Sequence, residues 1–228
     1  MKTTHTALVT AALLSIGARC GAATLQIPAG LVPESHKVVE TIRGDLNGDG
    51  RDDVVLLIKA RDRKGLFTDE QGGTVDRNRR GLVIALRNGD RYEPVLKNLN
   101  CFSSENEDGG VYFAPELSVS SRKGNLLIEY SHGRYGYWTY TFRYRNSAFE
   151  LIGYDSSSNS GPVVDRFISI NLLTSKVLKK VNTNADAQGG DERFRESWLK
   201  VPTPRRIALA DIEDFDELSV ERMLGLSR

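Results

Sequence analysis

A polar segment, residues 44–53, runs directly into an apolar, β-branched segment, and this junction constrains the fold more than any other feature. Side chains that carry oxygen stand at alternate positions 45, 47 and 49 and again at 53, and Gly50 permits the sharp turn that such spacing needs. Calcium takes about six to eight oxygen ligands, which a loop supplies from its positions 1, 3, 5 and 9 and from the carbonyl at 7. We therefore predict a calcium loop. Its predicted ligands are Asp45, Asn47, Asp49, the backbone carbonyl of Arg51 and Asp53.

The residues around this loop indicate strands on both sides of it. A helix-loop-helix calcium site requires a bidentate Glu at position 12, which here is Leu56. Leu56 belongs to the apolar run 54–58, and residues 38–43 alternate as a strand does. No Cys or His lies nearby to favour zinc or copper. An ordinary turn is the alternative, because clusters of Asp, Asn and Gly also form turns without an ion.

The loop resembles the calcium loops of FG-GAP/VCBS-type repeats, as in integrin-like propellers, where Asp-x-Asp/Asn-x-Asp-Gly-x-x-Asp links adjacent strands. The likeness covers residues 44–58 and implies the ligand roles named above. Segments 140–146, 149–155 and 168–174 are similar to those of a group of exported bacterial hypothetical proteins that begin with such a loop. This second resemblance implies no activity.

The first 23 residues predict a secretory signal peptide. Lys2 precedes a short apolar stretch, and small residues follow, with cleavage expected after Ala22 or Ala23. The apolar stretch is too short to span a bilayer. Cys20 raises the alternative of a lipid-anchored protein, although the bulky Arg19 precedes it where such sites favour a small residue. We therefore expect a periplasmic or secreted protein.

Charge and cysteine content narrow the possible partners. Removal of residues 1–23 takes away two basic side chains of 31 and no acid, which leaves 29 against 30 and a net charge of −1. Such a chain lacks the positive field on which nonspecific binding to nucleic acid depends, so we expect no nucleic-acid partner. Cys101 is then the remaining cysteine of two, and one thiol forms no disulfide within the chain.

Short apolar segments separated by turn signals predict one all-β domain over residues 24–228 that contains the calcium loop. We expect about eight to ten mostly antiparallel strands, arranged as propeller-blade-like sheets or as a β-sandwich. A full ring of six or seven blades needs more residues, since each blade takes about 40 to 50. The polar stretches 61–80, 103–110 and 156–161 are predicted loops, and a short helical turn is expected to begin at Asp211.

An aromatic segment, residues 135–145, carries the best candidates for ligand contact. Alternation along a strand places Trp138, Tyr140, Phe142 and Tyr144 on one face, where a role in the core is the ordinary explanation. The glycine-containing stretch just before them is freer to contact a ligand. The predicted contact residues are His132, Arg134, Tyr135 and Tyr137.

No catalytic motif stands out in the chain. The segment after the signal peptide holds His36 and His132, and neither belongs to a recognisable triad. Cys101 is more typical of a small buried apolar residue than of a nucleophile. We expect a binding or interaction module of the cell envelope, with an unidentified protein or glycan partner. A periplasmic inhibitor or immunity protein and a hydrolase of envelope polymers are the alternatives, the last because carboxylate pairs meet only in the fold.

Overall fold

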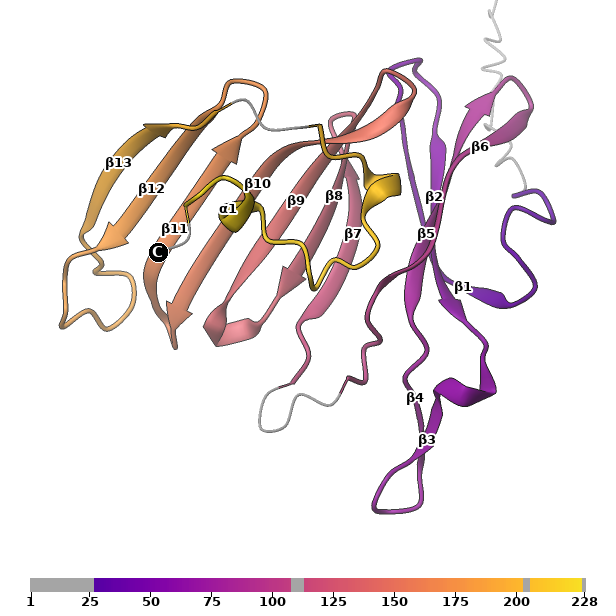
Figure 1. Ribbon diagram of the computed structural model, residues 1–228, viewed down its shortest axis with the longest axis horizontal. Helices are drawn as coiled ribbons and strands as arrows, with labels where there is room; N and C mark the ends of the chain where they lie inside the picture. Colours follow the sequence, from indigo (N-terminus) through magenta and orange to yellow (C-terminus); the bar gives the residue numbers. More distant parts are fainter. Residues whose placement is uncertain (1–26, 108–112, 203–205, 227–228) are drawn as a thin grey trace, which may run out of the picture.

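A computed structural model describes residues 27–107, 113–202 and 206–226 (Figure 1). The predicted signal peptide and Cys20 lie outside these residues, as do residues 108–110 of one predicted loop. The described chain is mostly β, with antiparallel sheets and one short C-terminal helix, which confirms the predicted fold class. None of the described helices is long and apolar enough to cross a membrane.

The first sheet has four antiparallel strands in the order β1-β2-β5-β6, an order that places β2 inside. The apolar run that follows the predicted calcium loop forms β2, and its first seven residues are buried. Because both faces of β2 are covered, its sequence is continuously apolar rather than alternating. The strands are β1 (His36–Gly44), β2 (Asp53–Ala60), β5 (Arg80–Asn88) and β6 (Arg91–Phe102).

The residues of the β5–β6 turn and of the edge strand β6 fit their backbone positions. Asn88 pairs with Arg91, so Gly89 and Asp90 form the two-residue turn, in which Gly89 has a φ of 61°. The glycine supplies the positive φ that such a turn needs at its first central position. Pro94 lies on the edge strand β6 beside a register shift, which is where a residue without an N–H is tolerated.

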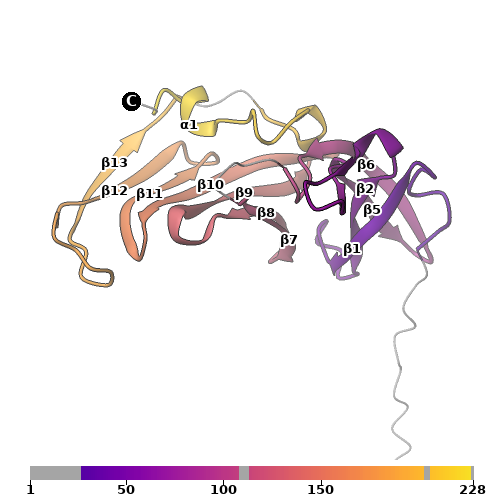
Figure 2. The same ribbon diagram turned by 90° about the horizontal axis from the view of Figure 1, so that it is seen from below.

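The second sheet is a meander of seven antiparallel strands, each hydrogen-bonded to its neighbours along the chain. Tight turns with positive φ at Gly124, Asn146 and Ser175 connect several of them. Seen edge-on, residues 206–226, here called the C-terminal segment, lie on one side of this sheet (Figure 2). The strands are β7 (Glu116–Arg122), β8 (Asn125–Ser131), β9 (Gly136–Arg145), β10 (Ala148–Ser160), β11 (Val163–Asn171), β12 (Lys176–Asn182) and β13 (Phe194–Lys200).

The two sheets and the C-terminal segment share one hydrophobic core. This core joins one face of the first sheet to strands β8 and β9 and to Phe215, and a smaller cluster covers the other face of β2. The C-terminal segment is tied to the first sheet where Asn98 Nδ2 donates to the carbonyls of Leu209 (3.0 Å) and Ile212 (2.7 Å). It is tied to the second sheet where the Tyr140 hydroxyl donates to the Leu218 carbonyl (3.0 Å).

Several local predictions were wrong. The serine-rich segment 156–160 is not a loop, because β10 continues through it and pairs with both β9 and β11. The stretch 61–80 contains the 3₁₀ turn η1 (Arg63–Gly65) and a small hairpin of β3 (Leu66–Thr68) and β4 (Thr74–Asp76). With β3 and β4, the described residues form thirteen strands, more than the eight to ten expected.

The predicted C-terminal helical turn is present but begins later than expected. Asp211 ends a 3₁₀ turn, η3 (Leu209–Asp211), and the α-helix is α1 (Val220–Met223), which Ser219 caps through a hydrogen bond to the Arg222 amide. The chain stays irregular between them because it must deliver Ile212 and Phe215 into the core.

Candidate functional site

The predicted calcium loop joins β1 to β2, as the sequence indicated. Asp45 is its organising residue: Oδ1 accepts from the amides of Gly48 (2.7 Å) and Asp49 (3.2 Å), and Oδ2 accepts from Gly50 (2.9 Å). The hydrogen bond from Gly50 contributes most to a lowered pKa of Asp45. Both glycines have φ near +80° (82° and 80°), a conformation that favours residues without a Cβ.

The other predicted ligands fall into two sets. The Asn47 side chain accepts from the Asp49 amide (3.0 Å), and Asp49 Oδ1 accepts from the Arg51 amide (2.9 Å), so these side chains fold over their own loop. Asp53 is fully buried instead, and its two oxygens accept from the amides of Leu46 (2.8 Å) and Arg87 (2.8 Å). Asp53 therefore fastens the loop to the sheet.

The residues present suit a hard cation in kind, since the loop supplies carboxylate and amide oxygens and no sulfur or imidazole. Burial raises the pKa of Asp53, and the nearby charges of Asp49 and Asp45 raise it further, so a cation there would relieve mutual repulsion. Within the described residues, however, no three or more His, Cys, Asp or Glu side chains are grouped so that they could hold a metal ion. Calcium binding thus stays a prediction.

A cleft of about 1100 Å³ lies between the second sheet, residues 103–107 and the C-terminal segment. Three neighbouring strands supply four aromatic side chains of its lining, with Tyr130 on β8, Trp138 and Tyr140 on β9, and Tyr154 on β10, and Phe113 and Phe215 add two more from outside the sheet. Trp138 stacks on Tyr130 with ring centroids 5.2 Å apart and planes 14° apart. The predicted aromatic face of β9 therefore has two roles. Phe142 is fully buried in the core, while Trp138 is half-buried and lines the cleft.

Tyr130 is the least satisfied polar residue of this lining. Its side chain is 2% exposed, and its buried hydroxyl has no hydrogen-bond partner among the described residues. Burial raises the pKa of Tyr130 far above its ordinary value, and the charge of Asp216 adds to that rise. Because most buried polar atoms in proteins are paired, an ordered water or a ligand group would satisfy this hydroxyl at the wall of the cleft.

Charged side chains also line the cleft. Glu221 on α1 accepts from Arg166 (2.8 Å) and from the Ser156 hydroxyl (3.1 Å), so this carboxylate is neutralised within the fold. Glu107 accepts from the amide (3.1 Å) and hydroxyl (3.0 Å) of Ser104. Asp216 is exposed and lines the same cleft.

The structure brings together three of the four predicted contact residues. His132, Arg134 and Tyr135 line a smaller hollow of about 570 Å³, and His132 also lines the large cleft. The rings of His132 and Tyr135 are 5.2 Å apart, and His132 Nε2 lies 2.7 Å from the Phe113 carbonyl oxygen. Tyr137 alternates with Trp138 along β9 and therefore lies on the opposite face of the sheet.

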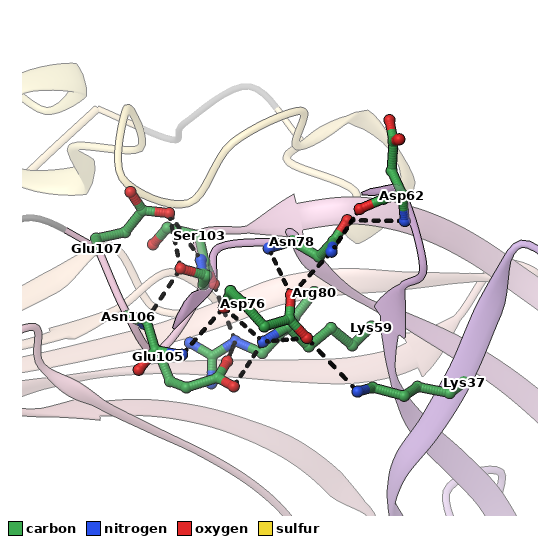
Figure 3. Close-up of polar contacts among 11 residues, drawn as sticks. Lys37, Lys59, Asp62, Asp76, Asn78, Arg80, Ser103, Glu105, Asn106 and Glu107 are labelled. Carbon is green, nitrogen blue, oxygen red and sulfur yellow. Dashed lines mark hydrogen bonds and ion pairs between the residues drawn. The ribbon is translucent and has the colours of Figure 1, made fainter. Parts of the chain in front are cut away.

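A buried charge network fixes the wall of the cleft at residues 103–107 (Figure 3). The Lys59 side chain is 3% exposed and its ammonium donates to Glu105 Oε1 (2.6 Å) and to the Asp76 carbonyl (3.0 Å), with Asp76 Oδ2 at 3.3 Å. Arg80 Nε donates to the Ser103 carbonyl (2.9 Å) and lies 3.7 Å from Glu105 Oε2. The first sheet thus holds the loop that borders the cleft.

Asp76 is the acidic hub of this network. Burial alone would raise its pKa, but hydrogen bonds from Asn78 and the hydrogen bond and charge of Lys59 lower that pKa to about 2. Arginines of the 61–80 stretch are used inside the fold as well, since Arg79 pairs with Asp214 (2.8 Å). Sequence reasoning missed this network, although a lysine at the end of the apolar run of β2 was a usable signal.

Comparisons of this chain with protein-family models, with curated proteins and with solved structures gave no match.

Proposed function

We propose that this protein is an exported calcium-binding β-domain protein that serves as a binding module of the bacterial envelope. The ligand would occupy the cleft on the second sheet, and the ion would stabilise the loop between β1 and β2. The observation that carries the proposal is the aromatic lining of the cleft, to which β8, β9 and β10 contribute side by side.

The shape and the lining of the cleft support binding. Ligand sites are typically concave and mostly apolar, with a few polar groups that set orientation. Tyr and Trp supply large contact areas and also hydrogen-bonding groups. The cleft combines such residues with the unpartnered hydroxyl of Tyr130, and rigid strands rather than a loop position its aromatic rings.

The proposed role of the ion is structural. Asp45, Asp49 and Asp53 place their charges on one short connection, so a bound cation would offset their repulsion and fix the turn. Extracellular calcium modules bind at about 10⁻⁴ to 10⁻³ M, an affinity that suits a site filled outside the cytoplasm.

Thermal unfolding in calcium and in chelator tests the ion. With a Kd of about 10⁻⁴ M, calcium at about 10 mM adds about 2.7 kcal/mol to the free energy of unfolding, which corresponds to several degrees in Tm. Asp45→Asn should remove this calcium-dependent shift, and Asp90→Asn, in the β5–β6 turn, should keep it. An unchanged Tm of the wild-type protein across calcium and chelator would contradict the proposed ion.

Capture from envelope extract tests the cleft. Ser158 is exposed, lines the cleft and lies on β10, so Ser158→Trp fills the cleft without removing a packed group. Ser118 is exposed on β7 and does not line it, so Ser118→Trp is the matched control. We expect a partner that the wild-type protein and the control retain and that Ser158→Trp loses. Equal retention by all three would place binding elsewhere.

A further inference from the structure

We infer that the ligand of the cleft is a basic polypeptide segment, one of whose Lys or Arg side chains lies between Asp216 and the aromatic lining. The inference rests on the proposed function, in that the cleft is taken as the ligand site. It adds the charge and the chemical class of the ligand, which the aromatic lining alone does not define.

The charges that line the cleft do not balance within the fold. Three carboxylates line it, those of Glu107, Asp216 and Glu221, together with one guanidinium, that of Arg166. Arg166 is committed to Glu221 at 2.8 Å. In the described part of the chain, Glu107 and Asp216 have no ion-pair partner within 4 Å, although the charges of both contribute to the pKa of Arg80.

The basic groups behind residues 103–107 are paired with carboxylates. Lys59 lies 2.6 Å from Glu105 and 3.3 Å from Asp76, and Arg80 lies 3.7 Å from Glu105. Lys37 lies 3.5 Å from Asp76, so this network holds three cations against two carboxylates and offsets part of the charge of Glu107 and Asp216. Together with the lining of the cleft, where Arg166 stands against three acids, the balance stays negative by one charge.

The aromatic rings beside these acids suit a cation. Tyr130 and Tyr140 are each only 2% exposed, so the rings that a ligand can reach are those of Trp138, which stacks on Tyr130, and Tyr154, which lies 5.3 Å from Tyr140. Asp216 lines the same cleft, and its charge adds to the effects of burial and of Tyr154 that raise the pKa of Tyr140. The faces of Trp and Tyr attract cations, and more strongly where water is excluded. An ammonium or guanidinium here would contact rings and carboxylate together.

Other ligand classes fit less well. A neutral sugar could stack on the rings, but it would bury Glu107 and Asp216 without an opposite charge, which is costly. An acidic ligand would be repelled. The cleft, at about 1100 Å³, is as large as the largest usual small-molecule sites and has room for a segment of several residues.

Trp138 provides a direct reporter of cleft occupancy. The chain has two tryptophans, and Trp198 lies on β13 and is 66% exposed, so Trp198→Phe leaves Trp138 as the fluorescent group. The probe is a capped peptide of alternating Ser and Arg, compared with peptides in which Gln or Glu replaces Arg. We expect the Arg peptide alone to shift the emission, with an affinity that falls as salt rises.

Charge-neutral variants connect the signal to the acids. Asp216→Asn removes a charge from an exposed side chain, and Glu107→Gln keeps an acceptor for Ser104. Each should weaken binding of the Arg peptide about tenfold, the scale of one charge-assisted hydrogen bond. Asp90→Asn, which changes the same charge away from the cleft, should not weaken it.

Two outcomes would overturn the inference in different ways. If the Gln peptide or a neutral oligosaccharide shifts Trp138 emission as strongly as the Arg peptide does, the cleft is a ligand site and only its cationic preference is wrong. If no probe shifts the emission at about 1 mM, the basic-segment inference fails. If Ser158→Trp also captures the partner as well as the wild-type protein does, the cleft is not the ligand site, and that part of the proposed function fails with the inference.

Discussion

Replacement of Asp76 by Asn measures what the buried charge network contributes. Asp76 lies at the end of β4, where Oδ1 accepts from the Asn78 amide (3.0 Å) and side chain (2.8 Å). Its Oδ2 faces Lys59 at 3.3 Å and Lys37 at 3.5 Å. Asn keeps the size and one acceptor oxygen of Asp, so the substitution removes mainly the charge.

The magnitude follows from the pKa. In the folded protein the pKa of Asp76 falls from 3.8 to about 2. A folded pKa below the unfolded one stabilises the protein at pH values above 3.8, and this contribution is lost as the pH falls through about 2. The difference corresponds to about 2 kcal/mol, and solvent screening lowers it, because the side chain is 28% exposed.

Urea denaturation at several pH values measures this contribution. We expect Asp76→Asn to unfold with a free energy lower by about 1 to 2 kcal/mol at pH 7, and the gap to close between about pH 4 and pH 2. Asp90→Asn, outside the network, should track the wild-type protein throughout. A gap that stays the same from neutral pH to about pH 2 would show that Asp76 acts through its shape and not its charge, and would refute the reasoning.

Three further predictions concern the core and the backbone. Phe215→Ala should cost about 3 to 5 kcal/mol in denaturant unfolding, since its ring lies 4.9 Å from Phe102 and 5.1 Å from Tyr140; a loss below about 1 kcal/mol would show that the C-terminal segment packs weakly. Gly136→Ala should lower Tm more than Gly161→Ala does: both have positive φ, but only the Cβ at 136 would lie 1.9 Å from the Ser157 carbonyl oxygen, and equal effects would contradict that contact. Burial raises the pKa of Cys101 to about 12, so a disulfide reagent at about pH 8 should react only after unfolding, and rapid reaction of the native protein would contradict this burial.

The sheet architecture was predictable because its signals are local. The run 54–58 and the alternation over 138–144 place side chains by strand geometry alone, and both segments form strands as expected. Lys123 and Gly124, both with positive φ, form a hairpin turn that the sequence also marks. Prediction failed at 156–160, where serines that usually indicate a loop are held in β10 by backbone pairing on both sides.

The cleft could not be predicted, because its residues come from distant parts of the chain. Ser104, Trp138 and Glu221 lie far apart in the sequence and line the same cleft only because the C-terminal segment crosses the second sheet. Three of the four predicted contact residues, His132, Arg134 and Tyr135, line a hollow next to the cleft, and their signal was local, a glycine-containing stretch before an aromatic strand. Tyr137 lies on the opposite face of the sheet. Asp216 carried no such signal, since acidic residues surround it in the sequence.

The arrangement of charges links the stability of the first sheet to the shape of the cleft. Glu105 binds Lys59 and Arg80 of the first sheet, and Glu107, two residues later, lines the cleft with Ser104. The network therefore engages Lys59 and Arg80 behind this wall of the cleft and holds the loop that presents Glu107. A change that frees Lys59 or Arg80 would at once loosen that wall and reduce the negative field beside Tyr130, so affinity for a cationic ligand should fall even where no residue of the cleft itself is altered.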